Sequence, residues 1–188
     1  VINTQTGATG VSHATNSISA PMALSHTSGL LSVTTLNGQI ILGSANWFLF
    51  NLNFVKDDIS THVQYGNFSA GRAVYSNPLS GRNSSGTYIR VSTNAIITNR
   101  INDVAMTVLP NAPIDADTGL PVPTIAVATD GGVSVIKDDG TVVDITNSGD
   151  TGYQVVGVVD FIGTSEIIFG MDASKGARAI RVHDIPLA

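Results

Sequence analysis

Two aspartates in a loop bordered by prolines come nearest to a metal site in this sequence. Asp115 and Asp117 are separated by one residue and are followed, at the same spacing, by Gly119. Carboxylates at this spacing beside a turn suit Ca²⁺, which takes oxygen ligands. A complete loop of that kind needs a further acid, usually a glutamate, and no glutamate lies nearby. We therefore favour a rigid polar loop, with a Ca²⁺ site at Asp115 and Asp117 as the alternative, and we expect no other cofactor.

The large amphipathic aromatic residues are a second set that could bind a partner. On an exposed sheet face such rings stack on sugars or form the centre of a protein interface. The alternative is that these side chains belong to the core or to the face of a strand. The residues concerned are Trp47, Tyr65, Tyr75 and Tyr88.

Catalytic patterns are weaker than the binding patterns. A Ser-His-Asp hydrolase of the common kind would show a Gly-x-Ser-x-Gly turn, and the sequence has none. Asp160 and Glu166 could form the carboxylate pair of a glycosidase, but with 14 acids in the chain some pair will satisfy that spacing by chance. The four histidines are dispersed, without the close spacing that indicates zinc. We predict that the protein is not an enzyme and assign no catalytic residue.

Composition excludes several classes of protein. Of the 188 residues only 12% are charged, the formal net charge is −5, and cysteine is absent. A helical bundle would be rich in Glu and Lys, and a disulfide-stapled module needs cysteines. A nucleic-acid-binding domain would be basic, and a membrane helix needs an apolar run of about 18 residues, which is not found here. We expect neither nucleic acid nor a membrane as a partner.

The elements that must position these residues are short strands. Residues 30–36 and 39–43 flank Asn37-Gly38, the pair typical of a tight hairpin. Residues 47–55 alternate with a period of two, with Phe48, Phe50, Leu52 and Phe54 on one face. Further strands are predicted at 62–65 and 72–75, and 88–91 is predicted to pair with 95–98. No segment of ten residues favours a helix, because Gly, Asn, Ser, Thr and Asp interrupt each candidate.

The C-terminal half predicts meanders that repeat. Strands are expected at 103–109, 124–128, 133–136 and 141–145, and a similar order returns at 154–159, 166–170 and 177–182. The interval is about 45 to 50 residues, which is the length of one four-stranded propeller blade. We predict an all-β protein of short antiparallel strands in blade-like four-stranded meanders, either a partial propeller or a sandwich. Its expected parts are an irregular N-terminal arm (1–29), a β domain or first blade-like region (30–100) and two blade-like meanders (101–188).

The segment from Pro123 to Ile145, PTIAVATDGGVSVIKDDGTVVDI, resembles propeller-type repeats, in which an apolar strand, a Gly-rich turn and a second strand recur. Together with Asn111 to Pro123 it is also similar to repeats in large structural proteins of tailed, especially marine, phages. The resemblance covers roughly residues 100–188. A closed propeller needs at least four blades, and at about 48 residues each this chain holds fewer than four. A larger propeller, an oligomer that completes the core and a twisted sandwich all stay open.

The resemblance implies a function carried by shape. We expect a non-enzymatic structural or assembly protein, a phage virion component that acts through contacts between subunits. Its partners would be other copies of itself or other virion proteins, and its location the virion or the extracellular space. The alternative is a carbohydrate-binding or carbohydrate-cleaving module of a tail or cell-surface protein, with surface glycans as partners.

Overall fold

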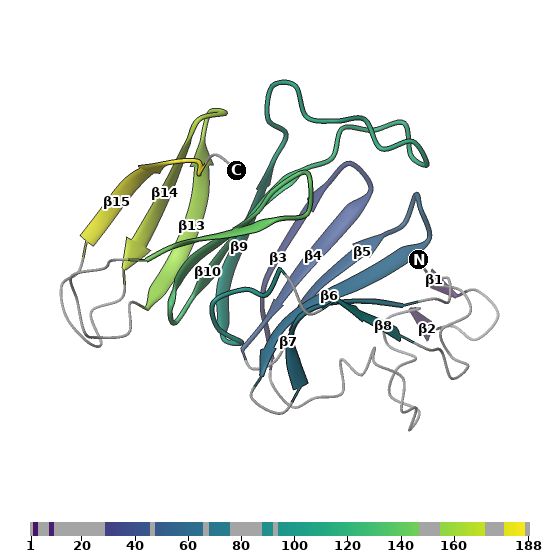
Figure 1. Ribbon diagram of the computed structural model, residues 1–188, viewed down its shortest axis with the longest axis horizontal. Coiled ribbons are helices and arrows are strands. Elements are labelled where there is room, and N and C mark those ends of the chain that lie inside the picture. The colour runs from purple at the N-terminus through teal and green to yellow at the C-terminus, as the bar shows by residue number, and fades with distance from the viewer. Residues whose placement is uncertain are drawn as a thin grey trace.

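The structure is a computed structural model in which every described element is a β-strand (Figure 1). It describes residues 2–3, 8–9, 29–45, 48–65, 68–75, 88–91, 94–146, 155–171 and 179–186. Side chains are described for the same residues except 2–3, 8–9, 63–75 and 88–91. These residues contain no helix, and the described part of the chain therefore offers none with the length and hydrophobicity that a bilayer crossing requires.

Fifteen strands are described, and neighbouring strands in each sheet pair antiparallel. Their bounds are β1 Ile2–Asn3, β2 Ala8–Thr9, β3 Leu30–Leu36, β4 Gln39–Ser44, β5 Leu49–Asn53, β6 Asp58–Tyr65, β7 Phe68–Tyr75, β8 Tyr88–Val91, β9 Ile101–Thr107, β10 Thr124–Thr129, β11 Gly132–Ile136, β12 Val142–Ile145, β13 Val156–Ile162, β14 Glu166–Met171 and β15 Ala179–Asp184.

Three sheets, each a simple meander in chain order, make up most of the described structure. We call β3 to β8 the first sheet, β9 to β12 the middle sheet and β13 to β15 the third sheet; β1 and β2 pair separately. β9 contacts both β3 and β13, so the first strands of the three sheets lie next to one another while the sheets fan outward (Figure 1). The all-β, antiparallel meander class predicted from the sequence is confirmed. The middle sheet is a four-stranded meander, and its neighbours have six and three strands.

The first sheet begins with the hairpin that the sequence predicts. Asn37 and Gly38 both adopt positive φ, 49° and 74°, as a two-residue hairpin turn of this kind requires. Phe50 and Leu52 project from one face of β5 into a cluster with Leu42 and Ile59, and Phe48 and Phe54 pack against that cluster. The period-two prediction for this strand is therefore confirmed. We call this group the outer cluster of the first sheet.

The opposite face of the first sheet packs on the middle sheet. Ile41 and Leu49 of the first sheet are fully buried there. The cluster they share with the middle sheet and the segment before it also contains Ile96, Ile101, Val104, Ile125, Val127 and Ile136. One hydrophobic core therefore joins β4 and β5 to β9, β10 and β11.

The middle sheet is buried on both faces. Every residue of β10 and β11 is buried, which explains the continuous apolar run that their sequences show. Ile125 and Val127 face the first sheet, and Ala126 and Ala128 face the third. On the third-sheet side the core also contains Ala105, Val133, Val135, Val156, Val159, Ile167, Phe169 and Ile185. The three sheets therefore stack in series, with the middle sheet between the other two.

One strand predicted from the sequence is wrong. Residues 95–98 form no strand, and β8 pairs with β7 instead. Ile96 is fully buried between the first and middle sheets, and the Ile97 N–H donates to the Ser134 hydroxyl at 2.9 Å. The segment connects two sheets across their shared core, and its apolar residues serve that core. The division of the chain into three parts stays a prediction, and the expected arm, 1–29, lies almost wholly outside the described residues.

Candidate functional site

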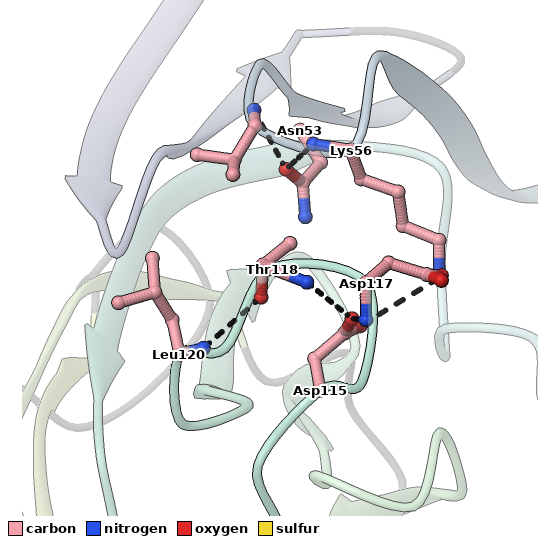
Figure 2. A network of polar contacts seen from close by, with 7 residues as sticks. Asn53, Lys56, Asp115, Asp117, Thr118 and Leu120 are labelled. Carbon is pink, nitrogen blue, oxygen red and sulfur yellow. Dashed lines mark hydrogen bonds and ion pairs between the residues drawn. The ribbon is translucent and has the colours of Figure 1, made fainter.

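The loop that carries Asp115 and Asp117 is a folded lobe between β9 and β10. Asp115 N–H donates to Leu120 O at 2.9 Å, Val122 N–H donates to Pro113 O at 2.9 Å, and Gly119, at φ 68°, closes the turn. The Asp115 carboxylate accepts the N–H groups of Asp117 at 2.8 Å and Thr118 at 3.1 Å (Figure 2). An aspartate that bonds its own backbone two residues on is an Asx turn, so the spacing of these acids builds the loop.

A lysine from the first sheet supplies the cation for these carboxylates. Lys56 Nζ lies 2.7 Å from Asp117 Oδ2 and 3.6 Å from Asp115 Oδ2, reaching them from the β5–β6 turn (Figure 2). That turn is held by Asn53, whose side-chain oxygen accepts the N–H groups of Val55 and Lys56. Asn37 Nδ2 also donates to Pro121 O at 2.9 Å, so two turns of the first sheet fasten the lobe.

The pKa values of Lys56 and Asp115 shift in the directions that favour their charged forms. The Asp117 carboxylate accepts a hydrogen bond from Lys56 and raises the pKa of the Lys56 ammonium. The Asp117 N–H is the largest of several influences that lower the pKa of the Asp115 carboxyl, with the Thr118 N–H and Lys56 adding to it and burial opposing it. The three side chains are partly exposed to solvent, where an ion pair contributes about 0 to 1 kcal/mol. These ion pairs therefore connect the loop lobe to the first sheet.

As a cation site, the pair of aspartates has few oxygen ligands. Among the described residues no group of three or more His, Asp or Glu side chains could hold a metal ion. Ca²⁺ takes six to eight oxygen ligands, and Lys56 already neutralises part of this charge. The Ca²⁺ alternative at Asp115 and Asp117 stays an untested prediction.

The aromatic candidates are placed only in part. Trp47 lies outside the described residues, and the three tyrosines are described by their backbone alone. The register sets Tyr75 of β7 directly opposite Tyr88 of β8. Tyr65 pairs with Phe68 at the other end of β7, so the structure brings two of the four candidates together and separates the third from them.

A polar junction that the sequence analysis missed joins the three sheets. Asp103 of β9 accepts the Ser32 hydroxyl of β3 at 2.6 Å through Oδ1 and the Val159 N–H of β13 at 3.0 Å through Oδ2. Val104 N–H donates to Asp103 Oδ1 at 2.9 Å and to Ser32 Oγ at 3.2 Å. We call these four residues the Asp103 junction. The one available signal was an aspartate at the start of a predicted apolar strand, a position that needs hydrogen-bond partners when half-buried.

The third sheet has an exposed apolar face, which the sequence analysis also missed. Its inner face packs on the middle sheet, yet on the outer face Val158 is 60% exposed, Ile180 77% and Val182 51%. The register places these residues with Ile162 and Ile168 on one surface, alongside the carboxylates of Asp160, Glu166 and Asp184. We call this surface the outer face of the third sheet. Exposed apolar residues gathered on one face, unlike scattered ones, mark an interaction surface.

Comparison with known proteins identifies no family. No protein-family model matches the chain, and no curated protein matches it. Among solved structures the chain is similar to the crystal structure of the computationally designed Ika4 protein, with 12% identical residues and a TM-score of 0.40. That similarity covers 86% of this chain and 94% of that chain. At this TM-score it carries no argument about the fold or the function.

Proposed function

We propose that this protein is a non-enzymatic structural component that acts by assembling with further copies of itself, as part of a phage virion. The observation that carries the proposal is the outer face of the third sheet. A terminal sheet of an isolated protein normally alternates apolar residues inward with polar residues outward. Here Val158, Ile180 and Val182 are more than half exposed instead.

The architecture supports the same proposal. The three sheets already bind one another face to face through apolar residues, and the middle sheet is covered on both sides. A series of this kind can be continued by another sheet, because each added sheet repeats the same apolar contact. The resemblance of residues 100–188 to phage structural repeats supplies the virion context.

Self-association tests the proposal. We expect size-exclusion chromatography with light scattering to show a mass that rises with concentration to a multiple of the 19.5 kDa chain. A glycan array is the companion measurement. A protein that stays monomeric at every concentration and binds glycans would overturn the proposal in favour of a carbohydrate-binding module. Capsid or tail genes beside its gene are the expected genomic context.

A further inference from the structure

The outer face of the third sheet corresponds to a face of the middle sheet that is buried. That face of the middle sheet is formed by apolar residues of β9, β10 and β11, and the third sheet covers it. On the third sheet, apolar residues of β13, β14 and β15 occupy the same side. Nothing among the described residues covers Ile180, at 77% exposure, or Val158, at 60%. The series of sheets therefore ends on a surface suited to one more sheet.

Polar contacts repeat along the series and indicate what that sheet would bring. Ser32 of the first sheet accepts the N–H of Val104 in the middle sheet at 3.2 Å. Asp103 of the middle sheet accepts the N–H of Val159 in the third sheet at 3.0 Å. At each of these two contacts, a polar side chain on the first strand of one sheet accepts a hydrogen bond from a backbone N–H on the first strand of the next sheet.

Asp160 continues this pattern at the open end. Asp160 Oδ1 accepts the N–H of Phe161, its own next residue, at 2.8 Å, as Asp103 Oδ1 accepts that of Val104 at 2.9 Å. Asp103 uses its other oxygen for the following sheet. Asp160 is exposed on the outer side of β13, the first strand of the third sheet.

At the opposite end of the series, the edge strand β3 has exposed apolar residues beside the outer cluster, which is itself buried. Val33 of β3 pairs with Leu42 and so lies on the face of the first sheet that is turned away from the middle sheet. Val33 is 62% exposed, and Leu30 and Leu31 beside it are each 50% exposed. These three residues, which we call the β3 patch, are apolar and uncharged. They lie on β3, the first strand of its sheet. Within the chain, the first strands β9 and β13 each donate a backbone N–H to a polar side chain of the preceding sheet.

We infer that the outer face of the third sheet binds a second copy of this chain through its β3 patch, with Asp160 accepting a backbone N–H of that β3. The arrangement repeats between two chains the contact that β9 makes with β13 within one chain. This inference rests on the proposed function and names the two surfaces through which the copies bind each other. Contact between two outer faces is disfavoured, because it would bring together two sets of carboxylates from Asp160, Glu166 and Asp184.

The test uses one substitution on each surface of the full chain. Ile180→Glu alters the outer face, Val33→Glu alters the β3 patch, and Ile114→Glu is the matched control, since Ile114 is 60% exposed on the loop lobe. Sedimentation equilibrium of each variant should show association weakened at least about tenfold for the first two, as for residues central to an interface, and unchanged for the control. Asp160→Ala should weaken association by less.

Mixing the two variants tests the pairing itself. A 1:1 mixture of Ile180→Glu and Val33→Glu retains one intact outer face and one intact β3 patch, so it should form a heterodimer although neither variant associates alone. Circular dichroism and thermal melting confirm that each monomer is folded, and Ile180→Thr, which keeps a β-branched residue in the strand, replaces Ile180→Glu if that variant unfolds. A wild-type chain that is monomeric throughout overturns the proposed function and this inference together.

Two other outcomes overturn the inference while leaving the proposed function in place. The first is an oligomer that Ile180→Glu does not weaken, which would mean that the copies meet elsewhere. The second is an oligomer weakened by Ile180→Glu but untouched by Val33→Glu, with no recovery in the mixture, which would mean that two outer faces meet.

Discussion

At the scale of single residues, the Lys56 contact shows how a pattern typical of metal sites can serve the fold. The Asp115 carboxylate accepts the backbone N–H groups of Asp117 and Thr118 in its own turn, which places the Asp117 side chain beside it. Their charge is then matched by an ammonium group from a turn roughly 60 residues earlier. The acid spacing was visible in the sequence, whereas the partner was not, because a lysine distant in sequence can meet it only once two layers pack.

The pH dependence of stability should reveal this contact. Because the pKa of Asp115 is lowered from 3.8, its ionised carboxylate stabilises the folded state above that pH, and the stabilisation is lost as the pH falls through the lowered pKa. Asp115→Asn keeps a side-chain oxygen for the turn but loses the charge. We expect it to reduce the free energy of unfolding by at most about 1 kcal/mol at neutral pH.

Urea unfolding of wild type and Asp115→Asn across the acid range measures this difference. The gap should be constant above about pH 5 and should narrow as the pH falls below 3.8 and through the lowered pKa of Asp115. A gap that persists undiminished in acid would show that the carboxylate charge is not responsible. Lys56→Met should lose a similar amount at neutral pH, since it removes the opposite member of the same pairs.

At the scale of elements, aspartate and glycine residues lie in the turns of the middle sheet and set their backbone conformation. The turn before β11 ends in Gly132, at φ 134°, and the turn before β12 ends in Gly140, at φ 82°. Thr129 Oγ1 donates to Gly132 O at 3.0 Å, and Asp139 accepts the Thr141 N–H at 2.8 Å. These are local hydrogen bonds, which is why the strands on either side of both turns could be predicted from the sequence.

The two glycines should respond very differently to the same substitution. A Cβ at Gly132 would lie 2.5 Å from the Ile145 carbonyl oxygen, a backbone atom that cannot rotate away, whereas a Cβ at Gly140 meets nothing within 4 Å. Gly140→Ala should cost about 1 to 2 kcal/mol, from its positive φ alone. Gly132→Ala adds the clash and should cost about 3 kcal/mol or more.

The midpoint of urea unfolding separates the two glycine variants, provided the slope with urea is unchanged. Equal losses for both would show that the strand after Gly132 shifts to accommodate the methyl group. That outcome would contradict the close pairing of β11 with β12 in this structure.

At the scale of the whole molecule, Asp103 is the residue on which the series of sheets converges. It bonds β3 and β13 from its position on β9 and is only partly accessible to solvent. Asp103→Ala removes the acceptor for the Val159 N–H and leaves the Ser32 hydroxyl without its carboxylate. Hydrogen bonds to a charged group contribute about 1.5 to 3 kcal/mol each, so we expect a loss of about 3 kcal/mol or more.

Chemical denaturation of Asp103→Ala and of Asp138→Ala, a control in a turn, measures this effect. We expect the control to change stability by less than about 0.5 kcal/mol. A loss at Asp103 no larger than that of the control would mean that the apolar cores alone hold the three sheets together.

Taken by itself, the sequence determined the strand class, several strand positions and the hairpin turns. These depend on side-chain alternation and on the backbone preferences of Asn, Asp and Gly, which act over a few residues. The prediction failed at 95–98, where Ile96 is apolar because it enters a core between two sheets. An apolar run of that length is compatible with a strand and with a buried connection alike.

Only the tertiary structure decided which sheet faces are covered, that Lys56 meets Asp115 and Asp117, and that Asp103 joins three sheets. β10 and β14 look similar as sequences, since both are apolar on two faces, yet β10 is buried on both and the sheet of β14 is open on one. Burial of a second face depends on which other sheet lies against it. That contact is made by residues far apart in the chain, so it cannot be predicted from local periodicity.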